Sequence, residues 1–252
     1  MDEINRVMEG KGHTVHQIMT AILAGGHILI EDIPGVGKTT LALAFSKVLG
    51  LDYQRIQFTP DIMPTDIAGF SIYHQGSEEF EFKEGAAMTN LLLADEINRT
   101  SPKTQSALLE AMEEGQITVD GITRDLPDPY IVIATQNPLE TTGTFPLPEA
   151  QLDRFLFKIN VNRTPADVLT RIVLNREMGV EPEISPVLNA QELLELMQMA
   201  RNVAIPEVVA DYIGRLVNAT HPGESEASGG VKYGASPRAA LGLAAAAKAR
   251  AL

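Results

Sequence analysis

Short apolar runs recur along the first 162 residues of the chain, and polar or amphipathic segments separate them. Five of these runs have the length of β-strands, and they cover residues 27–31, 53–58, 90–94, 130–135 and 155–161. Largely continuous apolar strands are typical of a sheet that is buried on both faces, and helices between the strands favour parallel pairing. The pattern therefore predicts an α/β fold with a five-stranded, mostly parallel sheet between helices.

Apolar residues at helical spacing predict the helices that cover this sheet. One such segment covers residues 5–23, where two glycines interrupt it, and a second covers residues 39–49. A third helix is predicted to begin after Ser101, because proline follows this residue as is typical of a first helical turn. It is predicted to end before Gly115.

Two segments alternate apolar and polar residues, a period that is typical of β-hairpins. They cover residues 70–85 and 116–126, and the second contains Asp120-Gly121, a favoured two-residue turn. The first hairpin carries four aromatic residues, namely Phe70, Tyr73, Phe80 and Phe82. These rings either fasten the hairpin to the fold or contact another protein.

The strand pattern ends near residue 162, and only helical spacing follows it. Helices are predicted over residues 166–178, 190–201, 206–218 and 237–252. We therefore expect residues 1–162 to form an α/β core and residues 163–252 to form a small all-helical domain. The last helix is rich in alanine and stops with the chain, and we expect the helical domain to be truncated there.

A glycine-rich turn follows the first predicted strand, in the segment ILIEDIPGVGKTT over residues 28–40. Backbone N–H groups of such a turn, together with the N-terminus of the next helix, favour a bound phosphate. The candidate phosphate-binding residues are Pro34, Gly35, Val36, Gly37, Lys38, Thr39 and Thr40. Lys38 would reach the β- and γ-phosphates of a nucleotide, and the Thr39 hydroxyl would bind Mg²⁺. Asp32 replaces the first glycine of the usual pattern, and similar turns occur without nucleotide, so the turn needs support from other residues.

Two further strands end in polar residues, and in open α/β sheets a ligand binds beyond the carboxyl ends of the strands. Asp95 and Glu96 follow the apolar residues 91–94. Asp95 would hold the Mg²⁺ shell through water, and Glu96 would polarise an attacking water. Alone, the pair is equally consistent with a solvated pair or a helix cap. Asn137 follows the fourth strand, where it would place the water or contact the γ-phosphate, unless it is only a turn residue before proline.

Two arginines complete the candidate catalytic residues. Arg154 stands just before the fifth strand, and Arg238 opens the last helix after Ser236, the expected cap. An arginine that reaches a transferring phosphoryl group stabilises the charge of the transition state. Taken alone, each arginine is better explained as part of a surface ion pair, and only the order of the preceding motifs supports catalysis.

Composition limits the classes of function. The chain has 252 residues, a formal net charge of −13 and no cysteine, which excludes disulfides, thiolate metal sites and cysteine nucleophiles. No apolar run reaches the roughly 18 residues of a membrane span. The first residues lack the basic and then apolar pattern of an export signal, so the cytoplasm is the expected location. A strongly acidic surface argues against general nucleic-acid binding.

These motifs resemble those of the AAA+ ATPases and, more narrowly, of the MoxR family. The resemblance covers residues 25–239 and rests on the segments GGHILIEDIPGVGKT, RIQFTPDIMPTDIAG, LLLADEINRTSPKTQSALLEAMEEGQITVDG, ATQNPLETTGTFPLPEAQLDRFLF and GASPRAA. It implies an AAA+ P-loop NTPase core with two hairpin insertions, followed by a helical lid domain. Carried over residue by residue, it assigns Lys38 and Thr39 to Walker A, Asp95 and Glu96 to Walker B, Asn137 to sensor 1, Arg154 to the arginine finger and Arg238 to sensor 2.

The family pattern implies a ring, usually a hexamer, that binds ATP and Mg²⁺ between its subunits and hydrolyses ATP. Arg154 would then reach the γ-phosphate held by a neighbour. The resemblance further implies a chaperone that remodels or matures protein complexes, for example by inserting cofactors or metals. Such a chaperone often works with a von Willebrand factor A-type partner.

Two other functions stay open, a nucleic-acid motor of the same clade and an ATP-gated scaffold with little hydrolysis. A hairpin that tracks DNA needs exposed lysine or arginine against the phosphates. Residues 70–85 carry four acids and one lysine, and residues 116–126 carry two acids and one arginine. The hairpins therefore favour a protein client, and the intact Glu96, Asn137 and Arg154 argue against a scaffold.

Overall fold

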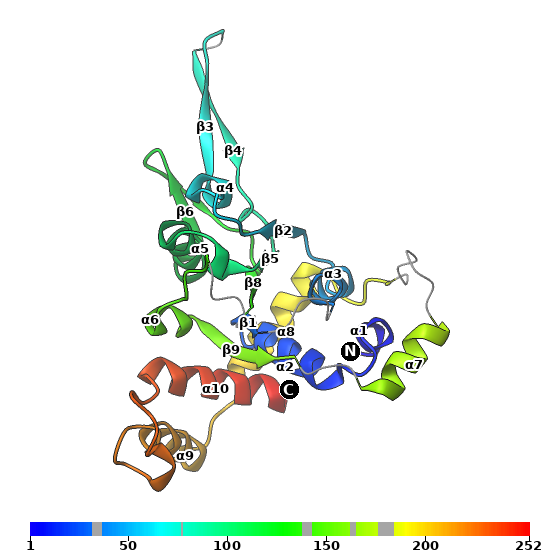
Figure 1. Cartoon of the computed structure of the whole chain (residues 1–252), viewed down its shortest axis with the longest axis vertical. Coiled ribbons are helices and arrows are strands. Elements are labelled where there is room, and N and C mark those ends of the chain that lie inside the picture. Colours follow the sequence, from blue (N-terminus) through cyan, green and yellow to red (C-terminus); the bar gives the residue numbers. More distant parts are fainter. Residues whose placement is uncertain (32–36, 77, 138–142, 162–164, 176–183) are drawn as a thin grey trace.

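The central sheet contains five parallel strands, as the sequence predicts (Figure 1). The computed structural model describes residues 1–31, 37–76, 78–137, 143–161, 165–175 and 184–252. The strands lie in the order β2–β5–β8–β1–β9. Their bounds are β1 His27–Glu31, β2 Tyr53–Gln57, β5 Leu91–Asp95, β8 Ile131–Gln136 and β9 Phe155–Asn160. Because every pairing is parallel, all five carboxyl ends lie at one edge, and the predicted α/β fold is confirmed.

The central strands are buried on both faces, because alternate side chains enter two separate hydrophobic cores. In β1, for example, Ile28 and Ile30 enter the first core and Leu29 enters the second. Helices α1 Asp2–Val7, α2 Gly12–Leu23, α3 Lys38–Val48 and α8 Ala190–Asn202 contribute to the first core. Helices α4 Pro64–Ala68 and α5 Pro102–Glu114 contribute to the second. Burial between two helical layers explains why these strands are continuous in apolar residues.

The segment predicted as one interrupted helix forms two helices, α1 and α2. Gly10 lies between them with φ +73°, a left-handed conformation that glycine adopts readily and that ends the helical path. A Cβ at this position would lie 2.9 Å from Cγ1 of Val168, in α7 Ala166–Asn175. The break is therefore fixed both by backbone conformation and by the close approach of another helix.

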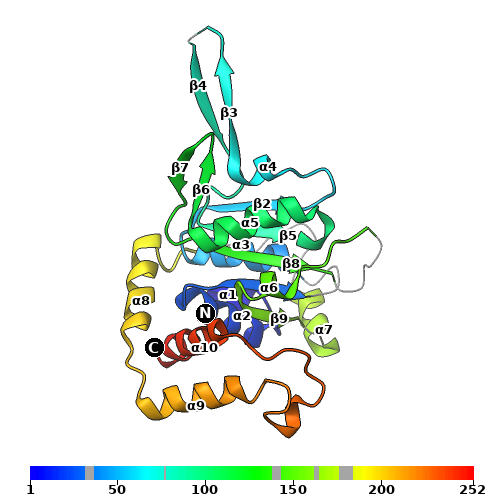
Figure 2. The same cartoon turned by 90° about the vertical axis from the view of Figure 1, so that its left-hand side faces the viewer.

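Both predicted hairpins are present. The first, β3 Gly69–His74 with β4 Glu79–Glu84, extends away from the sheet, and the second is β6 Gln116–Val119 with β7 Ile122–Asp125 (Figure 1, Figure 2). Phe82 packs against the second core, and the Arg124 guanidinium lies 3.9 Å from its ring centroid. Phe80 is 73% exposed and pairs with Tyr73. One aromatic side chain thus fastens the first hairpin, while the outer ones face solvent.

The described residues beyond β9 form helices joined by turns and irregular segments, and they include no strand. Besides α7 and α8, they contain α9 Glu207–Asn218 and α10 Pro237–Ala251. A 3-10 turn, Glu226–Ser228, lies between α9 and α10. Two further short elements precede β9, namely the 3-10 turn Ile97–Arg99 and α6 Glu149–Leu152. Because Leu193 and Met197 of α8 belong to the first core of the sheet, the division into residues 1–162 and 163–252 stays a prediction. Within the described ranges, no helix has the length and hydrophobicity needed to cross a membrane.

His27, the first residue of β1, is a buried histidine that links the sheet to α5. Its Nδ1 accepts a hydrogen bond from the Val132 N–H at 3.1 Å, so its Nε2 carries the proton and donates to the Met112 carbonyl at 3.1 Å. Burial lowers the pKa of His27 from 6.5 to about 4. The neutral ring is therefore the form that the fold stabilises.

Acidification should destabilise the protein through His27. Its folded pKa lies below its unfolded pKa, so this contribution to stability is complete above pH 6.5 and is lost as the pH falls toward 4. We expect about 2 kcal/mol of this loss between pH 7 and pH 5. Urea unfolding at both pH values would measure it, with His27→Gln losing less on acidification and the exposed control His13→Gln behaving as wild type. An equal pH dependence in all three proteins would contradict the prediction.

Candidate functional site

Three neighbouring strands bring polar residues to the carboxyl edge of the sheet. The parallel register of β5, β8 and β1 sets Ala94 opposite Ala134 and Glu31 opposite Gln136. The Gln136 side-chain amide donates to Glu31, which also forms an ion pair with Lys158 Nζ at 2.8 Å. The strand ends that the sequence marks as polar therefore lie side by side.

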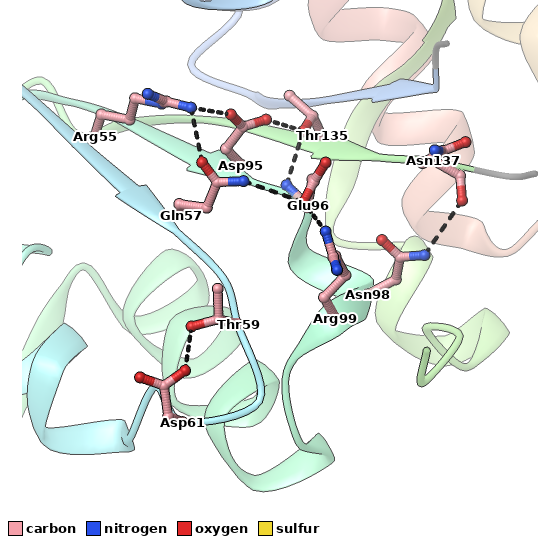
Figure 3. Close-up of polar contacts among 10 residues, drawn as sticks. All are labelled: Arg55, Gln57, Thr59, Asp61, Asp95, Glu96, Asn98, Arg99, Thr135 and Asn137. Atoms are coloured by element: carbon pink, nitrogen blue, oxygen red, sulfur yellow. Dashed lines mark hydrogen bonds and ion pairs between the residues drawn. The ribbon is translucent and has the colours of Figure 1, made fainter. Parts of the chain in front are cut away.

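Asp95 is a buried carboxylate at the end of β5, and each of its oxygens has a partner (Figure 3). Oδ1 accepts a hydrogen bond from Thr135 Oγ1 at 2.6 Å, and Oδ2 forms an ion pair with Arg55 Nη2 at 2.7 Å. Arg55 lies on β2 and Thr135 on β8, so the strands on either side supply the two donors. A buried carboxylate is tolerated only with such partners.

Glu96 combines a strained backbone with a side chain held by two donors. Its φ of 58° and ψ of 47° lie in the left-handed region, which costs a residue with a Cβ roughly 1–3 kcal/mol. The Glu96 N–H donates to Thr135 Oγ1 at 2.9 Å, and Oε2 accepts from Gln57 Nε2 at 3.1 Å and from Arg99 Nη1 at 2.9 Å. Because strain of this kind clusters at functional positions, it supports a functional role for Glu96.

Asn137 follows β8 at the same edge and is buried. Its backbone carbonyl accepts a hydrogen bond from Asn98 Nδ2 at 3.4 Å (Figure 3). Since β8 neighbours β5 in the sheet, Asn137 directly follows the strand adjacent to the one that ends in Asp95.

The predicted phosphate loop is described only in its second half. Pro34, Gly35 and Val36 lie outside the described residues, whereas Gly37, Lys38, Thr39 and Thr40 lie within them. Gly37 adopts φ 86° and caps α3, so the next three residues form the first turn of that helix. A helix N-terminus that closely follows the carboxyl end of a parallel strand is a favourable place for an anion.

Arg154 and Arg238 lie at the opposite, amino edge of the sheet. Arg154 immediately precedes the first residue of β9, and both arginines line one cavity with residues 25 and 26, which precede β1. Strands of this length separate the two edges by roughly 15–20 Å. Within one chain, the structure therefore does not bring these arginines together with the acidic pair.

The sequence interpretation missed four side chains that hold the acidic pair, namely Arg55, Gln57, Arg99 and Thr135. Arg55 and Gln57 are exposed residues of β2, a strand that the sequence does predict. Polar residues on a strand beside an acidic strand end are the signal that could identify them. That signal becomes usable only once the strand order places β2 next to β5.

Ser236 occupies the N-cap position of the last helix, as the sequence predicts, but it does not form the side-chain bond of a hydroxyl cap. Its hydroxyl makes no capping bond to α10 and donates instead to the carboxylate of Asp153, 2.9 Å from Oδ1 and 3.0 Å from Oδ2. The Asp153 carboxylate is a charged acceptor and therefore a strong partner for this hydroxyl. The serine therefore ties the start of α10 to the residue before Arg154.

Replacing Thr135 by valine should weaken the fold at the acidic pair. The change keeps the side-chain shape but leaves Asp95 Oδ1 and the Glu96 N–H without this partner, so we expect a loss of about 1–3 kcal/mol in unfolding free energy. Urea denaturation at pH 7 would measure it. The matched control is Thr118→Val, which removes an exposed hydroxyl from a hairpin and should cost less than about 0.5 kcal/mol. Equal losses in the two variants would contradict the assignment.

Comparisons with known proteins identify similar chains and a similar fold. A family model described as the ATPase family associated with various cellular activities (AAA) matches residues 27–157. The chain is 48% identical to the uncharacterized protein YeaC of Bacillus subtilis, over 100% of this chain and 78% of that protein. It is 44% identical to the chaperone MoxR1 of Mycobacterium tuberculosis, over 99% of this chain and 67% of that protein. A crystal structure of a candidate ATPase from Cytophaga hutchinsonii superposes with a TM-score of 0.89 at 42% identity, covering 99% of this chain and 77% of the other.

Proposed function

Because the chain belongs to the MoxR family of AAA ATPases, we propose that it binds and hydrolyses ATP with Mg²⁺ and uses this energy to remodel or mature protein complexes. The observation that carries the proposal is the acidic pair Asp95 and Glu96. Both acids are held by side chains of neighbouring strands at the edge where α3 presents its N-terminus.

The residues of this edge suit a magnesium nucleotide. In the proposed site, Lys38 and the first N–H groups of α3 bind the phosphates, with Pro34, Gly35, Val36, Gly37 and Thr40 completing the loop. The Thr39 hydroxyl and the Asp95 carboxylate are oxygen donors of the type that Mg²⁺ prefers. Since Arg55 pairs with one Asp95 oxygen, contact through water fits Asp95 best. Mg²⁺, when bound, neutralises charge on the β- and γ-phosphates.

Glu96 is the proposed general base, and Asn137 is proposed to orient the water or the γ-phosphate. Gln57 and Arg99 both donate to Oε2 of Glu96, so the other oxygen, Oε1, is the one that would accept a proton from water while these donors hold the side chain. Both donors are partly exposed or exposed side chains, and surface contacts of this kind are weak enough to exchange. Gln57 and Arg99 thus orient the Glu96 side chain, and these contacts can still exchange.

A ring of copies, by the family pattern a hexamer, is the proposed functional assembly. Arg154 and Arg238 lie at the edge opposite to their own acidic pair, so a neighbouring copy is the natural recipient of their charge. The cytoplasm is the proposed location, and a von Willebrand factor A-type protein and a protein complex are the proposed partners.

A protein client is favoured over nucleic acid by the charge of the projecting hairpin. The only lysine of β3 and β4 is Lys83, and it forms an ion pair with Glu81, which His74 also contacts. Glu78, Glu79 and Glu84 add further negative charge. Such a surface repels phosphates. Tight, salt-dependent binding of single-stranded DNA by the assembled protein would favour the nucleic-acid motor instead.

Replacing Glu96 by glutamine tests the proposed chemistry. Loss of the base should lower ATP hydrolysis roughly a hundredfold or more, while ATP binding is retained because the phosphate-binding residues are unchanged. Phosphate release and equilibrium binding of a fluorescent ATP analogue would measure the two effects. A pull-down with the ATP-bound variant should then retain client proteins.

The matched control is Glu110→Gln, which removes the same charge from an exposed position of α5 and should hydrolyse ATP as wild type. If wild type and Glu96→Gln hydrolyse ATP at the same rate, Glu96 is not the base. If wild type binds ATP without measurable hydrolysis in its assembled form, the ATP-gated scaffold is the better description.

A further inference from the structure

Arg154 and Arg238 share one carboxylate, that of Glu113 at the end of α5. Glu113 Oε2 accepts from Arg154 Nε at 2.8 Å and from Nη2 at 2.7 Å, and Oε1 accepts from Arg238 Nη2 at 2.6 Å. Glu113 lies on α5, Arg154 in the turn directly before β9 and Arg238 on α10. The glutamate is 41 residues from Arg154 and 125 residues from Arg238 in the sequence. Their meeting is therefore a property of the tertiary fold.

A second contact fixes the same geometry. The Ser236 hydroxyl donates to both oxygens of Asp153, the residue that precedes Arg154. Because Arg238 lies two residues after Ser236, this contact holds the start of α10 beside the Arg154 backbone. The carboxylate of Glu113 then bridges the two side chains through charge-assisted hydrogen bonds.

The charges require such a bridge. Two guanidinium groups this close repel each other unless an anion lies between them. Hydrogen bonds from Arg238 and then Arg154 lower the pKa of Glu113, so its carboxylate stays ionised at neutral pH. The Glu113 carboxylate offsets one of the two positive charges, and the Asp153 carboxylate lines the same cavity. The Arg238 side chain is 49% exposed, which leaves it accessible to an anion from outside the chain.

We propose that Glu113 is a positioning residue that holds Arg154 and Arg238 as one two-arginine group, which the ring presents to the γ-phosphate of ATP on the neighbouring copy. The inference rests on the proposed ATPase function and adds to it the role of Glu113, which places the two arginines relative to each other. Without Glu113, the two cations separate, and neither meets the phosphate in the required position.

Glu113→Gln tests the inference, with Glu114→Gln as the control that removes the same charge from the next, exposed residue of α5. In the assembled protein we expect Glu113→Gln to lower kcat on the order of tenfold to a hundredfold, as expected for misplaced catalytic groups. KM for ATP should change less than about twofold, because the nucleotide-binding edge of the variant is intact. Glu114→Gln should keep the wild-type kcat.

A second measurement separates positioning from a general structural role. Association of the protein in the presence of ADP and aluminium fluoride, followed by sedimentation, should be weaker in Glu113→Gln than in wild type. In an Arg154→Ala/Arg238→Ala background the Glu113→Gln change should have no further effect, because Glu113 acts through the two arginines. An equal effect in both backgrounds would overturn the inference.

The outcomes distinguish this inference from the proposed function. If wild type hydrolyses ATP and Glu113→Gln has an unchanged or raised kcat, the role of Glu113 is wrong and the ATPase function stands. If wild type shows neither hydrolysis nor nucleotide-dependent association, both are wrong.

Discussion

The parallel register of β5, β8 and β1 is the constraint on which the other features of the molecule depend. Parallel pairing places every carboxyl end at one edge of the sheet and every amino end at the other. The acidic pair therefore lies at one edge, beside the start of α3, and the two arginines lie at the opposite edge. The sheet thus divides the candidate chemistry of one chain into two separated halves.

The sheet also supplies the hydrogen-bond partners that stabilise the buried carboxylate of Asp95. Asp95 ends a strand whose other residues are buried and apolar, so its carboxylate would be strongly destabilised without partners. Thr135, fully buried on the adjacent strand, donates to Asp95 and accepts from the Glu96 N–H. One hydroxyl thereby satisfies two groups and helps to hold the left-handed backbone of Glu96. The strain at this position is offset by contacts that exist only because the register is fixed.

The sequence predicts the elements better than it predicts their contacts, and the reason is physical. Strands, hairpins and the ends of α5 follow from local composition, because burial on two faces, turn chemistry and caps act over a few residues. The pairing of Arg55 with Asp95 spans 40 residues and needs the strand order. Local sequence places Ser236 at the N-cap of α10, but it does not reveal that the hydroxyl donates to a carboxylate 83 residues away. Glu113, which pairs with both Arg154 and Arg238, is likewise 41 and 125 residues away from them, so local sequence patterns do not reveal these contacts.

The separation of the two edges also bears on how activity could be controlled. A chain that held its acids and arginines in one place would complete its own site, and hydrolysis would not depend on assembly. Here rigid strands keep them roughly 15–20 Å apart, and no side-chain rearrangement spans that distance. In the proposed ring, a second copy whose amino edge faces the first copy's carboxyl edge would bring the halves together. Glu113 already contacts both arginines within one chain. In the proposed ring, this contact would reduce the conformational freedom that the two side chains lose at the interface. The fold thus favours an activity that depends on contact between copies.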